Sequence, residues 1–196
     1  MKFKMSPRLA LLTIAAIFFL PLAVAYLMYS GSIDYNPVET RNLGVLVQPP
    51  VPADLSGLES LQSGSQSLEE LSGHWVVLHS LPDSCAEACL ESVTGLRQVH
   101  RSTGRNQPRI RLLLIARKQN PELATRLQNI YPSFFLALIN PELSTKLQDI
   151  GQVGEGGTYL IDPLGNIMMS YAAGYDPNDL KKDLKRLLTW SKLDEQ

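Results

Sequence analysis

The chain lacks the sequence signatures of the common nucleotide-binding, hydrolytic and zinc-binding proteins. Its 196 residues contain no P-loop, no HExxH, no GxSxG and no pair of CxxC motifs. An excess of basic residues is also missing, because 18 lysines and arginines stand against 19 aspartates and glutamates. Nucleic acids reward clustered positive charge, so no nucleic-acid partner is expected. The length suits one compact domain with a tail.

Charge is absent from one long stretch, residues 9–29 near the N-terminus. At 1.5 Å per residue a helix of this length spans about 30 Å, the thickness of a bilayer core. We therefore expect residues 9–29 to be a transmembrane anchor. A cleaved signal peptide is the alternative, because Ala23-Val24-Ala25 fits the small-x-small cleavage pattern.

The basic residues before this stretch predict its orientation. Lys2, Lys4 and Arg8 all precede the first acidic residue of the chain. Positive flanks remain in the cytoplasm, so residues 1–8 are expected to be a cytoplasmic flank and the globular part to be periplasmic or otherwise extracytoplasmic. The expected protein is a single-pass protein of the inner (plasma) membrane. Whether residues 9–29 are an anchor or a signal peptide, the globular part lies outside the cytoplasm, where its thiols can be oxidised.

The region after the anchor divides by composition. Residues 30–66 are rich in proline, serine and glycine and are expected to form an extracytoplasmic tether. Within that tether, "NLGVLVQ" (42–48) is a candidate edge strand. Residues 67–193 alternate apolar runs with helical patterns and are expected to be the folded domain.

The order of these patterns predicts the fold class. Strands are expected at 74–80, 109–117 and 134–139, a hairpin at 157–174, and helices at 86–102 and 176–193. Two similar segments, "NPELATRLQNI" (120–130) and "NPELSTKLQDI" (140–150), fit helix starts, because asparagine suits the N-cap and proline the first helical position. The alternative interpretation of this internal similarity is a duplicated binding element. Alternating strands and helices that end in a hairpin and a helix predict an α/β, thioredoxin-like sandwich, with a central mixed sheet flanked by helices.

Both cysteines of the chain lie in "LPDSCAEACLESV" (81–93), where Cys85 and Cys89 form a CxxxC motif. Spacing of i and i+4 at the start of a helix places the two sulfurs on one face. The free N–H groups and positive potential of a helix N-terminus stabilise thiolates. Such a pair can close reversibly into a disulfide or bind a soft ion such as Cu(I). A static structural disulfide and an inert remnant are the alternatives.

The strand "HWVVLHS", the CxxxC motif, the helix after it and "TYLIDPLGNIMMSY" together resemble the Sco/SenC family of membrane-anchored copper-delivery proteins. The resemblance covers roughly residues 70–190 and the anchor. It implies a thioredoxin-like domain that helps to assemble cytochrome c oxidase, as a copper chaperone or a thiol reductase. It also implies that Cys85 and Cys89 match the two copper thiolates, and that the partner is an oxidase subunit or another assembly factor.

One element of the family pattern is missing. The family has a late histidine ligand before the hairpin, where this chain has "GQVGEGGT" (151–158), and no histidine follows His100. The sequence therefore looks like a divergent member that lacks the late copper-ligand histidine. His79 is a further candidate ligand, or else an ordinary strand-end histidine, and His100 is expected to be solvated.

The working hypothesis follows from the cysteine pair. Cys85 and Cys89 are candidate catalytic residues for thiol–disulfide chemistry and candidate Cu(I) ligands for copper transfer. Cys85, at the exposed end of the motif, is expected to be the attacking thiol. The alternative is a non-catalytic scaffold or binding module, in which the fold and anchor persist but the pair is static or vestigial. A general disulfide or peroxide reductase fits the CxxxC spacing less well.

Overall fold

The computed structural model describes residues 6–30, 41–61, 66–151 and 155–191. The basic residues Lys2 and Lys4 lie outside these ranges, as does part of the predicted tether. The chain divides into two compact units between Arg41 and Asn42. Each unit is described by itself.

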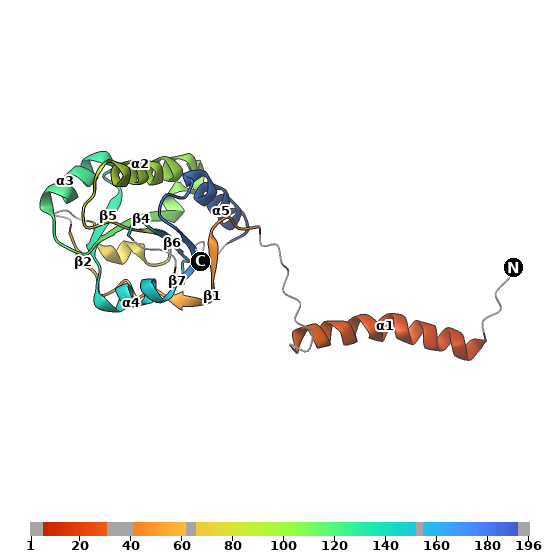
Figure 1. Cartoon of the computed structure of the whole chain (residues 1–196). Helices are drawn as coiled ribbons and strands as arrows, with labels where there is room; N and C mark the ends of the chain where they lie inside the picture. The colour runs from red at the N-terminus through yellow and green to blue at the C-terminus, as the bar shows by residue number, and fades with distance from the viewer. Residues whose placement is uncertain (1–5, 31–40, 62–65, 152–154, 192–196) are drawn as a thin grey trace. The chain divides into compact units, whose positions relative to one another are not determined.

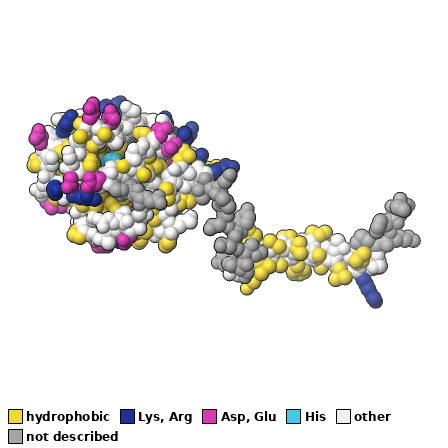
Figure 2. All heavy atoms as spheres, viewed as in Figure 1, with side chains coloured by type: hydrophobic (Ala, Val, Ile, Leu, Met, Phe, Trp, Pro, Cys, Tyr) yellow, Lys and Arg dark blue, Asp and Glu magenta, His cyan; other side chains and the backbone are white. Residues whose placement is uncertain are grey.

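The first unit contains helix α1 (Pro7–Tyr29). It begins with a satisfied cap, because the Ser6 hydroxyl accepts a hydrogen bond from the Leu9 N–H and proline takes the first helical position. Figure 2 shows hydrophobic side chains along this helix. From Pro7 to Met28 it is long and apolar enough to cross a membrane, a property that it would share with a signal sequence.

The second unit is built on a mixed sheet (Figure 1). Within the described residues the sheet has seven strands in the order β1-β7-β6-β3-β4-β5-β2. The strands are β1 (Val45–Pro52), β2 (Glu59–Ser60), β3 (Trp75–Ser80), β4 (Ile110–Ala116), β5 (Phe134–Leu138), β6 (Thr158–Ile161) and β7 (Asn166–Tyr171). Strands β3, β4 and β5 are parallel, and the other pairings are antiparallel.

Helices cover both faces of this sheet. They are α2 (Glu87–Ser102), α3 (Pro121–Ile130), α4 (Pro141–Asp149) and α5 (Pro177–Trp190), with the 3₁₀ turns η1 (Leu68–Leu71) and η2 (Gly104–Arg109). Buried side chains of α2, α3 and α5 join one core cluster, and those of α4 join the other. In β3, Trp75 and Val77 face the first cluster while Val76 and Leu78 face the second. The predicted α/β architecture, a central mixed sheet flanked by helices, is confirmed.

The folded unit begins earlier than the boundary predicted at residue 67. Strand β1 pairs with β7 at one edge of the sheet, as the edge-strand reading of 42–48 suggested, and β2 pairs with β5 at the other. Just before β1, the buried Asp183 carboxylate accepts hydrogen bonds from the Leu43 and Gly44 N–H groups, both at 2.9 Å. These contacts join residues some 140 positions apart. They could not be predicted from the composition of residues 30–66, which shows only that the segment is rich in proline and small polar residues. The predicted tether therefore contains two strands of the domain.

The prediction that His100 is solvated is wrong, because the last turn of α2 lies against η2 and β4. The side chain is 6% exposed. Its Nδ1 lies 3.0 Å from the Tyr131 hydroxyl, and its Nε2 lies 3.1 Å and 3.2 Å from the carbonyls of Gln107 and Ile110. His100 is thus a hydrogen-bonded core residue.

Candidate functional site

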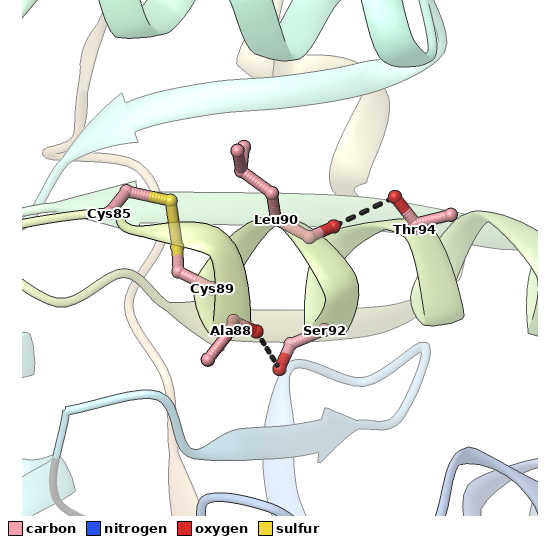
Figure 3. The surroundings of a disulfide bond; sticks show 6 residues. All are labelled: Cys85, Ala88, Cys89, Leu90, Ser92 and Thr94. Carbon is pink, nitrogen blue, oxygen red and sulfur yellow. Dashed lines mark hydrogen bonds between the residues drawn. A yellow bond between two sulfur atoms is a disulfide. The ribbon is translucent and has the colours of Figure 1, made fainter.

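The cysteine pair lies where the loop after β3 enters α2, and the structure joins it in a disulfide (Figure 3). The Cα atoms of Cys85 and Cys89 are 5.1 Å apart. Cys89 occupies the first turn of α2 and is 8% exposed, in the core cluster on that face of the sheet. Cys85 precedes the helix and is half-buried. The pair therefore has an accessible sulfur and a sheltered one, which is the asymmetry that stepwise thiol exchange requires.

The start of α2 differs from the starts of the other α-helices. Ala86 occupies the N-cap and, among the described residues, no side chain accepts a hydrogen bond from the first turn. The other four are capped by side-chain oxygens, from Ser6, Asn120, Asn140 and Asp176. The first-turn N–H groups of α2 therefore have no competing side-chain acceptor beside the sulfurs. Their positive potential favours a thiolate over a thiol.

Charged side chains from the loops after β4 and before β6 lie near the disulfide loop, which contributes Asp83. Lys118 Nζ lies 2.7 Å from Asp83 Oδ2, and Arg117 forms an ion pair with Glu155. The Lys118 ammonium donates to the Asp83 carboxylate and holds the pKa of that carboxyl below its usual range. A carboxylate this close in sequence to Cys85 would by itself oppose a thiolate there, and the charge of Asp83 is offset by the Lys118 cation.

The sequence analysis did not single out Arg117 and Lys118 as neighbours of the cysteines. The signal that could have found them is position. Arg117 and Lys118 follow β4 as the cysteine loop follows β3, and the carboxyl ends of adjacent parallel strands meet at one edge of a sheet. The loop before β6 reaches the same edge, because the Gly156 N–H donates to the Ser80 carbonyl at 2.8 Å and the Ser80 N–H to that of Gly157 at 2.9 Å.

His79, the further candidate ligand, is sealed inside the domain at the end of β3. It is 1% exposed, and burial lowers the pKa of its imidazole to about 4. Its Nδ1 lies 2.9 Å from the Thr158 hydroxyl. Within the described ranges, no group of three or more histidine, cysteine, aspartate or glutamate side chains is arranged to hold a metal ion. The structure therefore does not unite His79 and the two cysteines as a three-ligand site.

Comparison with known proteins identifies a family for the folded unit. Residues 75–191, more than half of the chain, match a family described as the transmembrane-like, thioredoxin-like, C-terminal domain. No curated protein matches the chain.

Solved structures resemble the domain over most of their own length. The apo Sco1 protein of Thermus thermophilus is 16% identical, with a TM-score of 0.56 over 78% of this chain and 99% of that one. A thiol:disulfide interchange protein of the thioredoxin family from Chlorobium tepidum is 18% identical, with a TM-score of 0.54 over 71% and 97%. Copper-bound ScoI of Arabidopsis thaliana is 14% identical, with a TM-score of 0.53 over 72% and 98%. At these identities the likeness confirms the predicted thioredoxin-like fold.

Proposed function

The chain belongs to the transmembrane-like, thioredoxin-like C-terminal domain family, and from this premise we propose that it is a membrane-anchored thiol–disulfide exchange protein that acts through Cys85 and Cys89. One observation carries the proposal. The half-buried Cys85 and the buried Cys89 are joined at a helix start that no side chain caps within the described part of the chain. A static staple would need neither the open helix end nor the accessible sulfur.

The exchange follows from the difference between the two sulfurs. In the reduced protein, the Cys85 thiolate attacks a disulfide of the partner, and one partner sulfur leaves as a thiolate. The Cys89 sulfur then attacks Cys85 in the mixed disulfide, which releases the second partner sulfur and closes the Cys85–Cys89 bond. Two electrons pass from this chain to the partner. The disulfide in the structure is the product state, and a dithiol donor must open it again.

The anchor and the resemblance together suggest where this chemistry acts. Helix α1 is long and apolar enough to hold the domain at a membrane. In the proposed topology the N-terminus is cytoplasmic, the membrane is the inner membrane, and the domain faces the oxidising side, where disulfides persist. The proposed partner is an oxidase subunit or another assembly factor of cytochrome c oxidase. The likeness to Sco proteins supports this assignment.

Cu(I) transfer is the second candidate function, with copper as cargo. The observation that favours it is the proximity of two sulfurs on one helix start, which the reduced protein would offer as a pair of soft ligands. Two thiolates suit Cu(I), whereas Cu(II) prefers added nitrogen ligands. The described residues do not assemble a third ligand with the pair. Transfer of Cu(I) is therefore supported better than stable storage of Cu(II).

One experiment on the full-length chain in detergent separates these functions from the scaffold alternative. The protein is equilibrated with glutathione and dithiothreitol buffers, and alkylation of free thiols gives the fraction reduced. A reduction potential between about −270 and −120 mV, the range of exchange proteins, supports the exchange function. A value below about −300 mV, typical of structural disulfides, would support the scaffold instead. Stoichiometric Cu(I) retention against a competing chelator, lost in Cys85→Ser, would support copper transfer.

A further inference from the structure

A buried imidazole nitrogen without a partner lies on the sheet face that carries the disulfide. Among the described residues, the buried side-chain atoms that lack a hydrogen-bond partner are Trp75 Nε1, His79 Nε2 and Arg97 Nε. A buried polar atom without a partner destabilises the folded protein, because it gives up its hydrogen bonds to water and gains none in return. The unpaired nitrogen of His79 has a physical explanation if it gains a hydrogen-bond partner in another state of the protein.

The register of β3 and the direction of α2 place His79 and the cysteines at the same end of the sheet, on the same face. Side chains 75, 77 and 79 share one face of β3, and Trp75 and Val77 belong to the same cluster as Cys89. The far end of α2 lies over the start of the sheet, because His100 Nε2 is 3.2 Å from the Ile110 carbonyl and Ile110 pairs with Trp75. From Trp75 to His79 the strand advances about 13 Å. From residue 99 back to residue 89 the helix advances about 15 Å. His79 and Cys89 thus lie at the same level.

The other side of the imidazole is already engaged. His79 Nδ1 pairs with the Thr158 hydroxyl at 2.9 Å, directly across the β3–β6 ladder. Thr158 also hydrogen-bonds Tyr175, which packs against the same cluster as the disulfide. The ring is therefore held by one nitrogen, and Nε2 is left for a group that the oxidised protein does not provide.

We propose that His79 is a positioning residue for the redox reaction, whose Nε2 hydrogen-bonds the Cys89 sulfur once the disulfide is opened. This inference rests on the proposed exchange function. In the disulfide, the Cys89 sulfur has no hydrogen to donate, whereas as a thiol it gains a donor at a residue that is only 8% exposed. The bond exists only in the reduced state, so His79 makes the pair easier to reduce.

The reaction balances with a dithiol as reductant. A partner with two thiols gives up two electrons and two protons, and its sulfurs join in a new disulfide. The Cys85–Cys89 bond breaks, and each sulfur receives one proton. The hydrogen that arrives on Cys89 is the one shared with His79 Nε2.

The test compares two buried histidines, His79 on β3 and His100 at the C-terminal end of α2, in the full-length chain in detergent. His79→Phe is expected to lower the equilibrium constant for reduction by dithiothreitol about tenfold, equivalent to about 30 mV for two electrons. His79→Gln, which retains a polar group at this position, is expected to recover part of the loss. His100→Phe removes a second buried ring, which already has three partners, and should leave the constant within twofold. A shift below twofold in His79→Phe, or an equal shift in His100→Phe, would overturn the inference.

A second measurement keeps this result separate from the proposed function. Urea unfolding of the oxidised and the reduced protein gives the effect of His79→Phe on each state. We expect the free energy of unfolding to fall more in the reduced variant than in the oxidised one, because loss of the hydrogen bond to Thr158 is common to both states whereas the proposed bond to Cys89 exists only in the reduced state. This difference can be measured even if the wild-type potential proves too low for exchange, which would sink the function alone. Equal effects on the two states would sink the inference alone.

Discussion

The two ends of helix α2 solve the same physical problem in opposite ways. At its C-terminal end the buried His100 has partners on both ring nitrogens, and the Thr103 hydroxyl donates to the His100 carbonyl at 2.6 Å. At its N-terminal end, within the described residues, the helix has no side-chain cap, and on β3, the strand that leads into it, the buried His79 has an unpaired Nε2. Trp75 Nε1 and Arg97 Nε, two further buried atoms that lack a partner among the described residues, lie nearer the C-terminal, closed end, so the two ends differ in their histidines and in the helix cap, and not in every polar atom. The open end coincides with the cysteines, where unmet hydrogen-bonding capacity would serve the proposed exchange.

Removing the sulfur at the open end should have the largest effect. Cys85→Ser is expected to lower thiol–disulfide exchange by more than a hundredfold, because no attacking thiol remains at the accessible position. Loss of the small disulfide ring should also lower the free energy of unfolding by about 2 kcal/mol. Exchange is measured by mixed-disulfide trapping and stability by urea titration. Ser84→Ala, in the same loop, is the control, and retained exchange in Cys85→Ser would contradict the assignment.

The next largest effect is expected from acid, which should lower the free energy of unfolding through His79. Burial lowers the folded-state pKa of His79 to about 4, below its unfolded value near 6.5, so between these pH values the unfolded state binds more protons. The free energy of unfolding should therefore fall as the pH falls from about 6.5 to 4, by up to about 1.4 kcal/mol per pH unit from this group. Urea titrations across this range, compared with His79→Phe, measure the contribution. Parallel pH curves for the two proteins would contradict it.

Closing the open end with a cap should slow the chemistry by a smaller factor. In Ala86→Asp, a carboxylate at the N-cap takes first-turn N–H groups of α2 and adds negative charge beside Cys85. The thiolate is then disfavoured, and alkylation of the reduced protein at pH 7 should slow about tenfold, in line with a pKa raised by about one unit. Ala88→Asp adds the same charge without occupying the cap and should slow it less. Equal slowing would attribute the effect to charge alone.

The local features of this contrast could be predicted from the sequence. Apolar spacing predicted β3, β4 and β5 to within one or two residues, and the repeated Asn-Pro pairs correctly predicted the starts of α3 and α4, whose Asn120 and Asn140 side chains accept the expected hydrogen bonds. Capping and periodicity depend on residues a few positions apart, so a single sequence contains them. The i, i+4 spacing likewise brought the cysteines together.

Features that depend on distant contacts escaped prediction. The burial of His100 requires Tyr131, 31 residues away, and the pairing of Asp83 with Lys118 spans 35. Thr158 reaches His79 only because β6 returns antiparallel to β3 after 79 residues. None of these pairs leaves a periodic signal in the sequence. The cysteine pair could therefore be predicted from the motif, whereas its polar surroundings depend on the topology of the fold and could not.

The smallest expected effect lies at the closed end and tests whether the contrast is real. The Tyr131 hydroxyl serves both His100 Nδ1, at 3.0 Å, and the Gln107 side-chain amide, at 2.8 Å. Tyr131→Phe leaves two partly buried polar groups unpaired, so the free energy of unfolding should fall by about 1 kcal/mol. Because these groups lie at the opposite end of α2 from the disulfide, the equilibrium with dithiothreitol should stay within twofold of the wild type. A larger redox shift would show that the two ends are coupled through the helix, and the division between a stabilising end and a reactive end would then fail.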